Sequence, residues 1–283
     1  MSAASRLALL LLAILVVTAC SGDSQAGSPS TGTPSLTAAA SDAASAAEAD
    51  LTIYAAASLK KAFAGVKAAY EAANPGVRLT MSFDASSALE TQIEQGAPAD
   101  VFASADTKNP QKLVDAGYAT SPVTIFAGNA LTVIVPTANP AGIAGPADLA
   151  RSGVKVVAAG DAVPITRYAD RLIANLAGQP GYPADYAAKV RANTVSREDN
   201  VAAVVSKVEL GEGDAAIVYV SDARNSTRVT ALAVPADANV PATYGVVTVK
   251  ASMDPAAAAA FTAWLAGPEA QAILATYGFL PLP

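Results

Sequence analysis

The sequence predicts an α/β protein built as two lobes. Segments typical of buried strands alternate with segments of helical periodicity, and the 283-residue chain repeats this alternation in two sets of about a hundred residues each. A strand–helix alternation of this kind implies mostly parallel sheets that are covered by helices on both faces. The apolar content of 52% is large enough to fill two such cores.

Apolar patterning defines the elements of the first set. A short apolar run at 51–55 predicts a strand, and large apolar residues at helical spacing predict the helix that follows. Alternating residues predict a second strand, and the capping-box sequence Ser87-Ala88-Leu89-Glu90 opens a second helix. The predicted elements are strands at 51–55, 77–83 and 101–103, and helices at 58–73, 87–95 and 110–117.

The second set follows the same logic. Pro164 is typical of a first helical turn, and Ser196-Arg197-Glu198-Asp199 resembles the cap of a further helix. The predicted elements are strands at 130–135, 154–159, 193–195, 215–220 and 244–249, and helices at 164–177, 196–208, 255–265 and 269–277.

Charge and composition exclude several classes of function. The net charge of −6 argues against a nucleic-acid binder. The sequence has no histidine, which removes His-ligated zinc and the usual Ser–His and Cys–His nucleophile pairs. The single cysteine, Cys20, excludes intrachain disulfides and iron–sulfur clusters.

The N-terminal segment is predicted to direct export and anchoring. Residues 1–19 have the basic start and the apolar run of a signal peptide, and this run is short for a membrane span. It ends in Val17-Thr18-Ala19-Cys20, which resembles a bacterial lipobox, where the cysteine is lipidated and becomes the mature N-terminus. The alternative is an ordinary signal peptide with a chance cysteine. Residues 20–50 are mostly small and polar, so we expect a flexible linker that tethers the protein outside the cytoplasm, at the bacterial cell membrane.

Two serines follow predicted strands at the points where helices begin. Ser58 follows strand 51–55, and Ser86 follows strand 77–83. Ligands of open parallel sheets lie beyond the strand ends, where helix N-termini offer free N–H groups and positive potential. The serines therefore indicate a donor-rich pocket suited to an anion. The alternative is that they only cap their helices, since serine is a preferred cap.

Longer motifs carry a family resemblance. They are LTIYAAASL at 51–59, FDASSAL at 83–89, QGAPADVFASAD at 95–106, GEGDAAIVYVSD at 211–222 and YGF at 277–279. Together they resemble the periplasmic molybdate-binding proteins, the capture components of molybdate ABC importers. The resemblance covers nearly all of 51–283 and implies a type II periplasmic-binding-protein fold, whose two lobes close over a tetrahedral oxyanion. Lobe I is expected at 51–130 and 245–283 and lobe II at 131–244, with hinge crossings near 129–132 and 243–246.

The resemblance also implies a set of ligand contacts. Ser58 and Ser86 would each give a hydroxyl and backbone donors, Ile165 a backbone N–H and Tyr219 a hydroxyl. A further contact position falls at Asn200. Other members often have alanine at the position of Ile165 and valine at that of Asn200, substitutions that backbone contacts tolerate. Asn200 can also add a side-chain donor.

Such a donor set suits molybdate. Near neutral pH this dianion has no proton, so its ideal partners are donors only. Many convergent dipoles can compensate a buried charge without a fixed lysine or arginine. Tungstate has the same shape and charge, and sulfate has the same charge but is smaller.

The charged residues near these motifs have alternative interpretations. Glu198 and Asp199 suit either an acid/base or metal pair or, more simply, a helix start where they offset the dipole. Asp100 and Asp106 flank a strand and are expected to fix turns. Arg167 and Arg171 lie one helical turn apart, where they either attract anions or form a solvated helix face.

The expected function is capture of molybdate, or tungstate, and delivery to the permease of an ABC importer. We expect a lipid-anchored monomer without catalysis, cofactor or bound free metal ion. One alternative is the same fold binding another small oxyanion such as sulfate. A second is a lipoprotein hydrolase that uses Ser58 or Ser86 with Lys60 or Lys61 as base, and a third is an adhesive surface protein.

Overall fold

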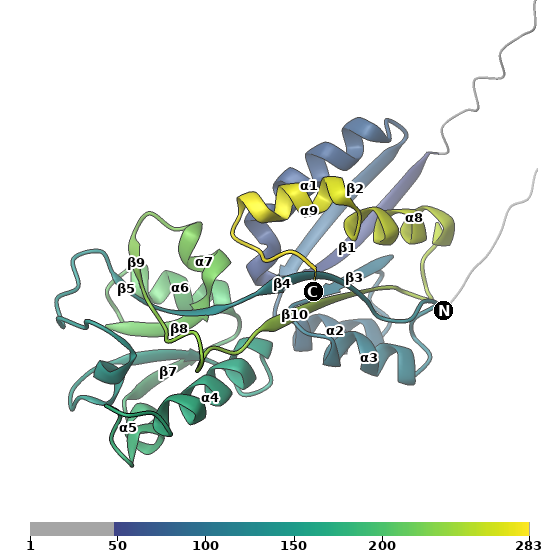
Figure 1. Cartoon of the computed structure of the whole chain (residues 1–283). Coiled ribbons are helices and arrows are strands. Elements are labelled where there is room, and N and C mark those ends of the chain that lie inside the picture. The colour runs from purple at the N-terminus through teal and green to yellow at the C-terminus, as the bar shows by residue number, and fades with distance from the viewer. Residues whose placement is uncertain (1–47, 283) are drawn as a thin grey trace, which may run out of the picture. The chain divides into compact units, whose positions relative to one another are not determined.

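The computed structural model describes residues 48–282, which form two five-stranded sheets (Figure 1). The predicted signal peptide 1–19, Cys20 and the predicted linker as far as residue 47 lie outside the described residues. The sequence predicts that the linker extends to residue 50. Instead Ala49 and Asp50 already belong to the first strand, because they pair with Val77 and Arg78.

The first sheet and its helices are called lobe I. Lobe I consists of β1 (Ala49–Ala56), η1 (Ala57–Leu59), α1 (Lys60–Ala73), β2 (Val77–Asp84), α2 (Ser86–Glu94), β3 (Val101–Ser104), α3 (Lys108–Asp115), β4 (Thr124–Asn129), β10 (Ala242–Thr248), α8 (Pro255–Leu265) and α9 (Pro268–Thr276). The strand order is β2-β1-β3-β10-β4. Helices α1, α8 and α9 pack on one face of the sheet, and α2 and α3 pack on the other (Figure 1).

The second sheet and its helices are called lobe II. Lobe II consists of β5 (Leu131–Pro136), η2 (Pro146–Ala150), β6 (Val156–Ala159), α4 (Pro164–Ala177), α5 (Tyr186–Ala192), β7 (Thr194–Glu198), α6 (Val201–Glu209), β8 (Ala215–Tyr219), α7 (Val220–Arg224) and β9 (Val229–Leu232). The strand order is β7-β6-β8-β5-β9. The expected two-lobe α/β architecture is therefore confirmed.

Both sheets are mixed, which differs from the mostly parallel sheets expected from the sequence. In lobe I, β1 pairs parallel with β2 and β3, whereas β10 pairs antiparallel with β3 and β4. In lobe II, β6 pairs parallel with β7 and β8, whereas β5 pairs antiparallel with β8 and β9. The antiparallel pairs arise because the strand that enters each sheet from the other lobe runs against its neighbours.

The chain crosses between the sheets twice. The first crossing is Ala130, between β4 and β5, within the predicted range 129–132. The second is the segment 233–241, between β9 and β10. It precedes the predicted crossing at 243–246, because Ala242 and Thr243 already pair with β4.

Two predicted helix caps are wrong. Ser87-Ala88-Leu89-Glu90 does not form a capping box, because Ala85 is the N-cap of α2 and the buried Glu90 carboxylate pairs with Lys112 at 3.0 Å. The cap predicted at Ser196–Asp199 is also wrong, because strand β7 extends through Glu198. The helix predicted at 196–208 therefore begins later, as α6, with Asn200 as its N-cap.

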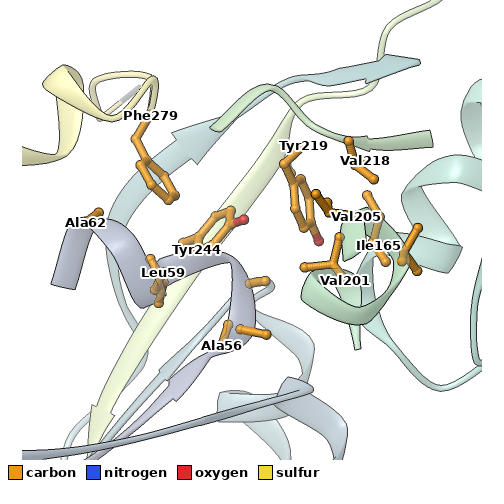
Figure 2. Packing of buried hydrophobic residues seen from close by; sticks show 14 of the residues in the cluster. Ala56, Leu59, Ala62, Ile165, Val201, Val205, Val218, Tyr219, Tyr244 and Phe279 are labelled. Carbon is orange, nitrogen blue, oxygen red and sulfur yellow. The ribbon is translucent and has the colours of Figure 1, made fainter. Parts of the chain in front are cut away.

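Aromatic residues fill the core near the crossings. Tyr219 at the end of β8 and Tyr244 in β10 are almost completely buried, and their ring centroids lie 5.6 Å apart (Figure 2). Tyr244 also packs edge-on against Phe279 at 5.4 Å. The two lobes are therefore joined by packed side chains as well as by backbone. None of the helices formed by residues 48–282 has the length and hydropathy needed to cross a bilayer.

Candidate ligand-binding site

A small cavity lies between the lobes, where several helical segments begin. Its walls come from the starts of η1, α2, α4 and α6 and from the end of β8. The lining residues are Ala56, Ala57, Ser58, Asp84, Ala85, Ser86, Ala105, Val163, Pro164, Ile165, Val201 and Tyr219. Its open volume is only about 10 Å³, so the cavity is small in this arrangement of the lobes. The small alanines bring the cavity close to backbone N–H groups.

Lobe I contributes the two predicted serines. Ser86 Oγ accepts a hydrogen bond from the Ala105 N–H at 3.0 Å, and Ser58 Oγ lies 2.9 Å from Tyr244 Oη. Neither side chain caps its helix, because the N-caps of η1 and α2 are Ala56 and Ala85. The capping alternative is therefore wrong, and both hydroxyls are held at the cavity wall.

Lobe II contributes Ile165 and Tyr219. Ile165 is the second residue of α4, so its amide has no acceptor within the helix. Tyr219 is 1% exposed, and within residues 48–282 no group is hydrogen-bonded to its Oη. Figure 2 shows this hydroxyl directed toward the Ile165 and Val201 side of the cavity. Burial raises the pKa of Tyr219 well above its ordinary value, so the hydroxyl keeps its proton and acts as a donor.

Asn200 does not line the cavity. Its Oδ1 accepts a hydrogen bond from the Ala203 N–H at 3.1 Å and caps α6, while its Nδ2 donates to Asp84 Oδ1 across the lobes at 3.0 Å. The neighbouring Val201, the first residue of α6, lines the cavity in its place. The sequence contained a hint of this one-residue shift from 200 to 201. Other family members often have valine at this contact, and Val201 is the valine next to Asn200.

Asp84 is the acid among the lining residues. Its Oδ1 already accepts two hydrogen bonds, from the Ala85 N–H at 2.7 Å and from Asn200. No lysine or arginine is among the lining residues of the described chain. The charge of an anion in this cavity would therefore be balanced by hydroxyl and N–H dipoles rather than by an ion pair.

Other polar contacts join the lobes around the cavity. Arg167 on α4 pairs with Asp106 beyond β3, and Lys61 on α1 donates to the carbonyl oxygen of Asn225. Asp106 also accepts a hydrogen bond from the Asn109 N–H at 2.9 Å, so it fixes a turn as expected. Arg167 is thus a contact between the lobes, but its side chain is 40% exposed and Arg171 is exposed as well, so the solvated helix face expected from the sequence is present.

The remaining predicted carboxylates have structural partners. Asp100 accepts hydrogen bonds from the Thr52 N–H at 2.7 Å and from Ser252 Oγ at 2.6 Å, and so ties β1 to the segment after β10. Glu198 is the last residue of β7 and lies 3.8 Å from Lys207 Nζ. Across residues 48–282, no cluster of three or more acidic, histidine or cysteine side chains is suited to a metal ion.

Comparison with known proteins identifies the family. Residues 51–280 match the profile described as bacterial extracellular solute-binding protein. The chain belongs to this family of extracellular solute-binding proteins. It is 37% identical to the molybdate-binding protein ModA of Mycobacterium bovis over 81% of this chain and 84% of that protein.

Two further comparisons agree with the first. The molybdate-binding protein ModA of Haemophilus influenzae is 32% identical over 83% of this chain and 91% of that protein. The structure of the Azotobacter vinelandii periplasmic molybdate-binding protein superposes with a TM-score of 0.70 at 23% identity, covering 82% and 99% of the two chains. The resemblance predicted from the sequence motifs is therefore confirmed, and the last comparison shows the shared fold.

A second cleft of this solute-binding protein opens beside the cavity. Ser58, Lys61 and Asp222 are among its lining residues, and it has about 180 Å³ of open volume. Burial raises the pKa of Asp222 to about 7, although the Tyr219 N–H, which donates to Asp222 Oδ2 at 3.3 Å, and the Lys61 charge both lower it. The Asp222 carboxyl therefore titrates near neutral pH. It is in contact with the Tyr219 backbone through this hydrogen bond.

Proposed function

We propose that this solute-binding protein captures molybdate, or tungstate, and delivers it to the permease of an ABC importer. The observation that carries the proposal is the buried Tyr219 hydroxyl, which has no partner within residues 48–282 and is directed at a cavity walled by two serine hydroxyls. A buried donor of this kind costs free energy until a ligand accepts its hydrogen bond. The names of the M. bovis and H. influenzae relatives support molybdate as that ligand.

The proposed contacts are hydroxyl and amide donors from both lobes. They are the side chains of Ser58, Ser86 and Tyr219 and the backbone N–H groups of Ile165 and Val201. A fully deprotonated dianion accepts hydrogen bonds at every oxygen, so it can use all of these donors. Donors from two lobes also favour the closed arrangement when the ligand is bound.

The bonding of the serines favours binding over hydrolysis. A serine nucleophile needs a base within hydrogen-bonding reach. Ser86 Oγ instead accepts from the Ala105 N–H, Ser58 Oγ pairs with the Tyr244 hydroxyl, and Lys61 donates to the Asn225 carbonyl. We therefore propose a binding protein that needs neither catalysis nor a cofactor.

Calorimetric titration of the purified protein tests the ligand. Molybdate and tungstate should bind at one site per chain, with sulfate much weaker and phosphate weakest. Sulfate binding as tight as molybdate binding would assign the site to another oxyanion. Release of product from ester substrates without stoichiometric oxyanion binding would favour the hydrolase.

The location is proposed from the N-terminal sequence. We propose that Cys20 is lipidated and that the protein works as a monomer tethered to the outer face of the cell membrane. Cys20→Ser should abolish labelling by a fatty-acid analogue and release the protein from membranes, while oxyanion binding persists. Unchanged labelling in the variant would show that the lipobox interpretation is wrong.

A further inference from the structure

A chain of buried hydrogen bonds leads from the cavity to both crossings. Ser58 Oγ lies 2.9 Å from Tyr244 Oη, and Asn129 Nδ2 donates to Tyr244 Oη at 3.4 Å and to Ser221 Oγ at 2.8 Å. Asn129 is the last residue before the Ala130 crossing, and Tyr244 lies in β10 just after the second crossing. The proposed ligand contact Ser58 is therefore connected to the segments that join the two lobes.

The direction of these hydrogen bonds can be assigned from Asn129. Its Oδ1 accepts from the Ala130 N–H at 3.0 Å, which only the oxygen of the amide can do. The amide nitrogen therefore faces Tyr244 and Ser221 and donates to them. Asn129 is completely buried, so this orientation is fixed by its surroundings.

The Tyr244 hydroxyl then donates to Ser58. If Ser58 donated instead, the Tyr244 hydrogen would have no acceptor among residues 48–282, at a side chain that is 0% exposed. Leaving a buried donor unpaired is costly, whereas Ser58 faces the cavity and can direct its own hydrogen there. Burial also raises the pKa of Tyr244 well above its ordinary value, so the phenol keeps the proton it donates.

We propose that Tyr244, held by Asn129, is a positioning residue that makes the Ser58 hydroxyl a donor to the bound oxyanion. This inference rests on the proposed function. Tyr244 does not line the cavity and acts only through Ser58. Tyr244 and Asn129 flank the two crossings, so the residues that position Ser58 lie beside the segments that join the lobes.

A double-mutant cycle on the full protein tests the proposal, with calorimetric molybdate titration as the readout. Tyr244→Phe removes one oxygen and keeps the ring that packs against Tyr219 and Phe279. It should weaken molybdate binding about three- to tenfold, and Ser58→Ala should weaken it about ten- to a hundredfold. In the Ser58→Ala background, Tyr244→Phe should change the affinity less than twofold, because it has no hydroxyl left to position.

Tyr186→Phe is the matched control. Tyr186 is also 0% exposed, and its hydroxyl donates to the Pro146 carbonyl at 2.7 Å in lobe II, away from the cavity lining. The Tyr186→Phe variant should have a lower melting temperature but the same affinity for molybdate as the wild type. Asn129→Ala, run through the same cycle with Ser58→Ala, provides a second set of affinities if Tyr244→Phe does not fold.

The outcomes separate the two proposals. If the wild-type protein does not bind molybdate, the proposed function fails, and the positioning role fails with it. If the wild type binds molybdate but the Tyr244 and Ser58 effects multiply, or Tyr244→Phe binds like wild type, only the positioning role is overturned. Loss of affinity in Tyr186→Phe would likewise overturn it, since a general loss of core hydrogen bonding would then explain the Tyr244 effect.

Discussion

Lobe I and lobe II both contribute hydroxyl groups to the cavity, but these hydroxyls differ in whether they already have a hydrogen-bond partner. The lobe I hydroxyls already have partners, since Ser86 accepts from the Ala105 N–H and Ser58 pairs with Tyr244. In lobe II, no group among residues 48–282 is hydrogen-bonded to the buried Tyr219 hydroxyl that faces the cavity. The lobe I hydroxyls are therefore held in place by hydrogen bonds without a ligand, whereas the Tyr219 hydroxyl of lobe II has no hydrogen bond until a ligand supplies one.

This difference suggests how binding and stability are divided between the lobes. A hydroxyl that is bonded within its own lobe supports that lobe's fold as well as the ligand. An unpartnered buried hydroxyl destabilises the unliganded fold slightly and gains its hydrogen bond only from the ligand. Substitutions in lobe I should therefore affect stability and affinity together, and substitutions at the lobe II contacts should separate them.

Ser86→Ala should have the largest combined effect. It removes a hydrogen bond to a charged ligand, so molybdate affinity should fall about ten- to a hundredfold. It also leaves the Ala105 N–H without its acceptor, so the free energy of unfolding of the unliganded protein should fall by roughly 1–3 kcal/mol. Calorimetry and urea unfolding measure the two quantities. A loss of stability with unchanged affinity would remove Ser86 from the site.

Tyr219→Phe should separate the two quantities. It deletes the unpartnered hydroxyl and keeps the ring, so affinity should fall about tenfold while the unliganded protein is as stable as wild type or slightly more stable. The same titration and unfolding measurements apply. Destabilisation by more than about 1 kcal/mol would reveal a partner for this hydroxyl and would break the contrast between the lobes.

Asp222→Asn should change how the free energy of unfolding depends on pH, at a lobe II carboxyl next to Tyr219. Burial raises the pKa of Asp222 from its ordinary value of 3.8 to about 7, so the folded state holds this proton more tightly than the unfolded chain does. Its contribution to stability is fully present below about pH 4 and is lost as the pH rises toward about 7. The variant should therefore be more stable than wild type at pH 8, on the order of 1–4 kcal/mol, with little difference near pH 4.

Urea unfolding of both proteins at several pH values measures this effect. Asp170→Asn is the matched control, because it removes a carboxylate from the exposed surface of α4. A constant difference between Asp222→Asn and wild type from pH 4 to pH 8 would contradict the prediction.

Asn200→Ala should have the smallest effect. It removes the Asp84 contact between the lobes and the α6 cap, but no cavity wall. Molybdate affinity should fall only about two- to fivefold, because the closed arrangement loses one hydrogen bond. Asn200→Ser retains a capping oxygen and should recover stability but not affinity. A hundredfold loss in Asn200→Ala would return Asn200 to the ligand contacts.

The sequence predicted that Ser58 and Ser86 lie at one cavity because the motifs around them are local. Ser58 and Ser86 stand directly after predicted strands, so their place beyond the sheet edge follows from the alternation of elements. The contact that the resemblance implies at Asn200 lies one residue away from the cavity wall, which Val201 forms as the first residue of α6. The positions of Tyr244 and Asn129 behind Ser58 depend on pairing across more than a hundred residues, which no local pattern contains.

The secondary-structure elements also differ in how well the sequence predicts them. The helices at 164–177 and 255–265 match their predicted bounds, because their sequences have clear starts at a proline. Strands β4 and β9 and helices α5 and α7 were missed, because four to seven residues carry too little periodicity. The mixed pairing was also missed, since strand direction depends on where the chain crosses between lobes rather than on local composition.

The late position of β10 has a consequence for the order of folding. In lobe I, β10 lies between β3 and β4, and Leu280 forms a bridge to Gly128 near the end of β4. The lobe II sheet is contiguous from residue 131 to residue 232. During N-to-C synthesis, all strands of lobe II therefore emerge before β10, the last strand of lobe I along the chain, which has to insert between β3 and β4. The lobe whose first strands emerge earliest is the last to be completed.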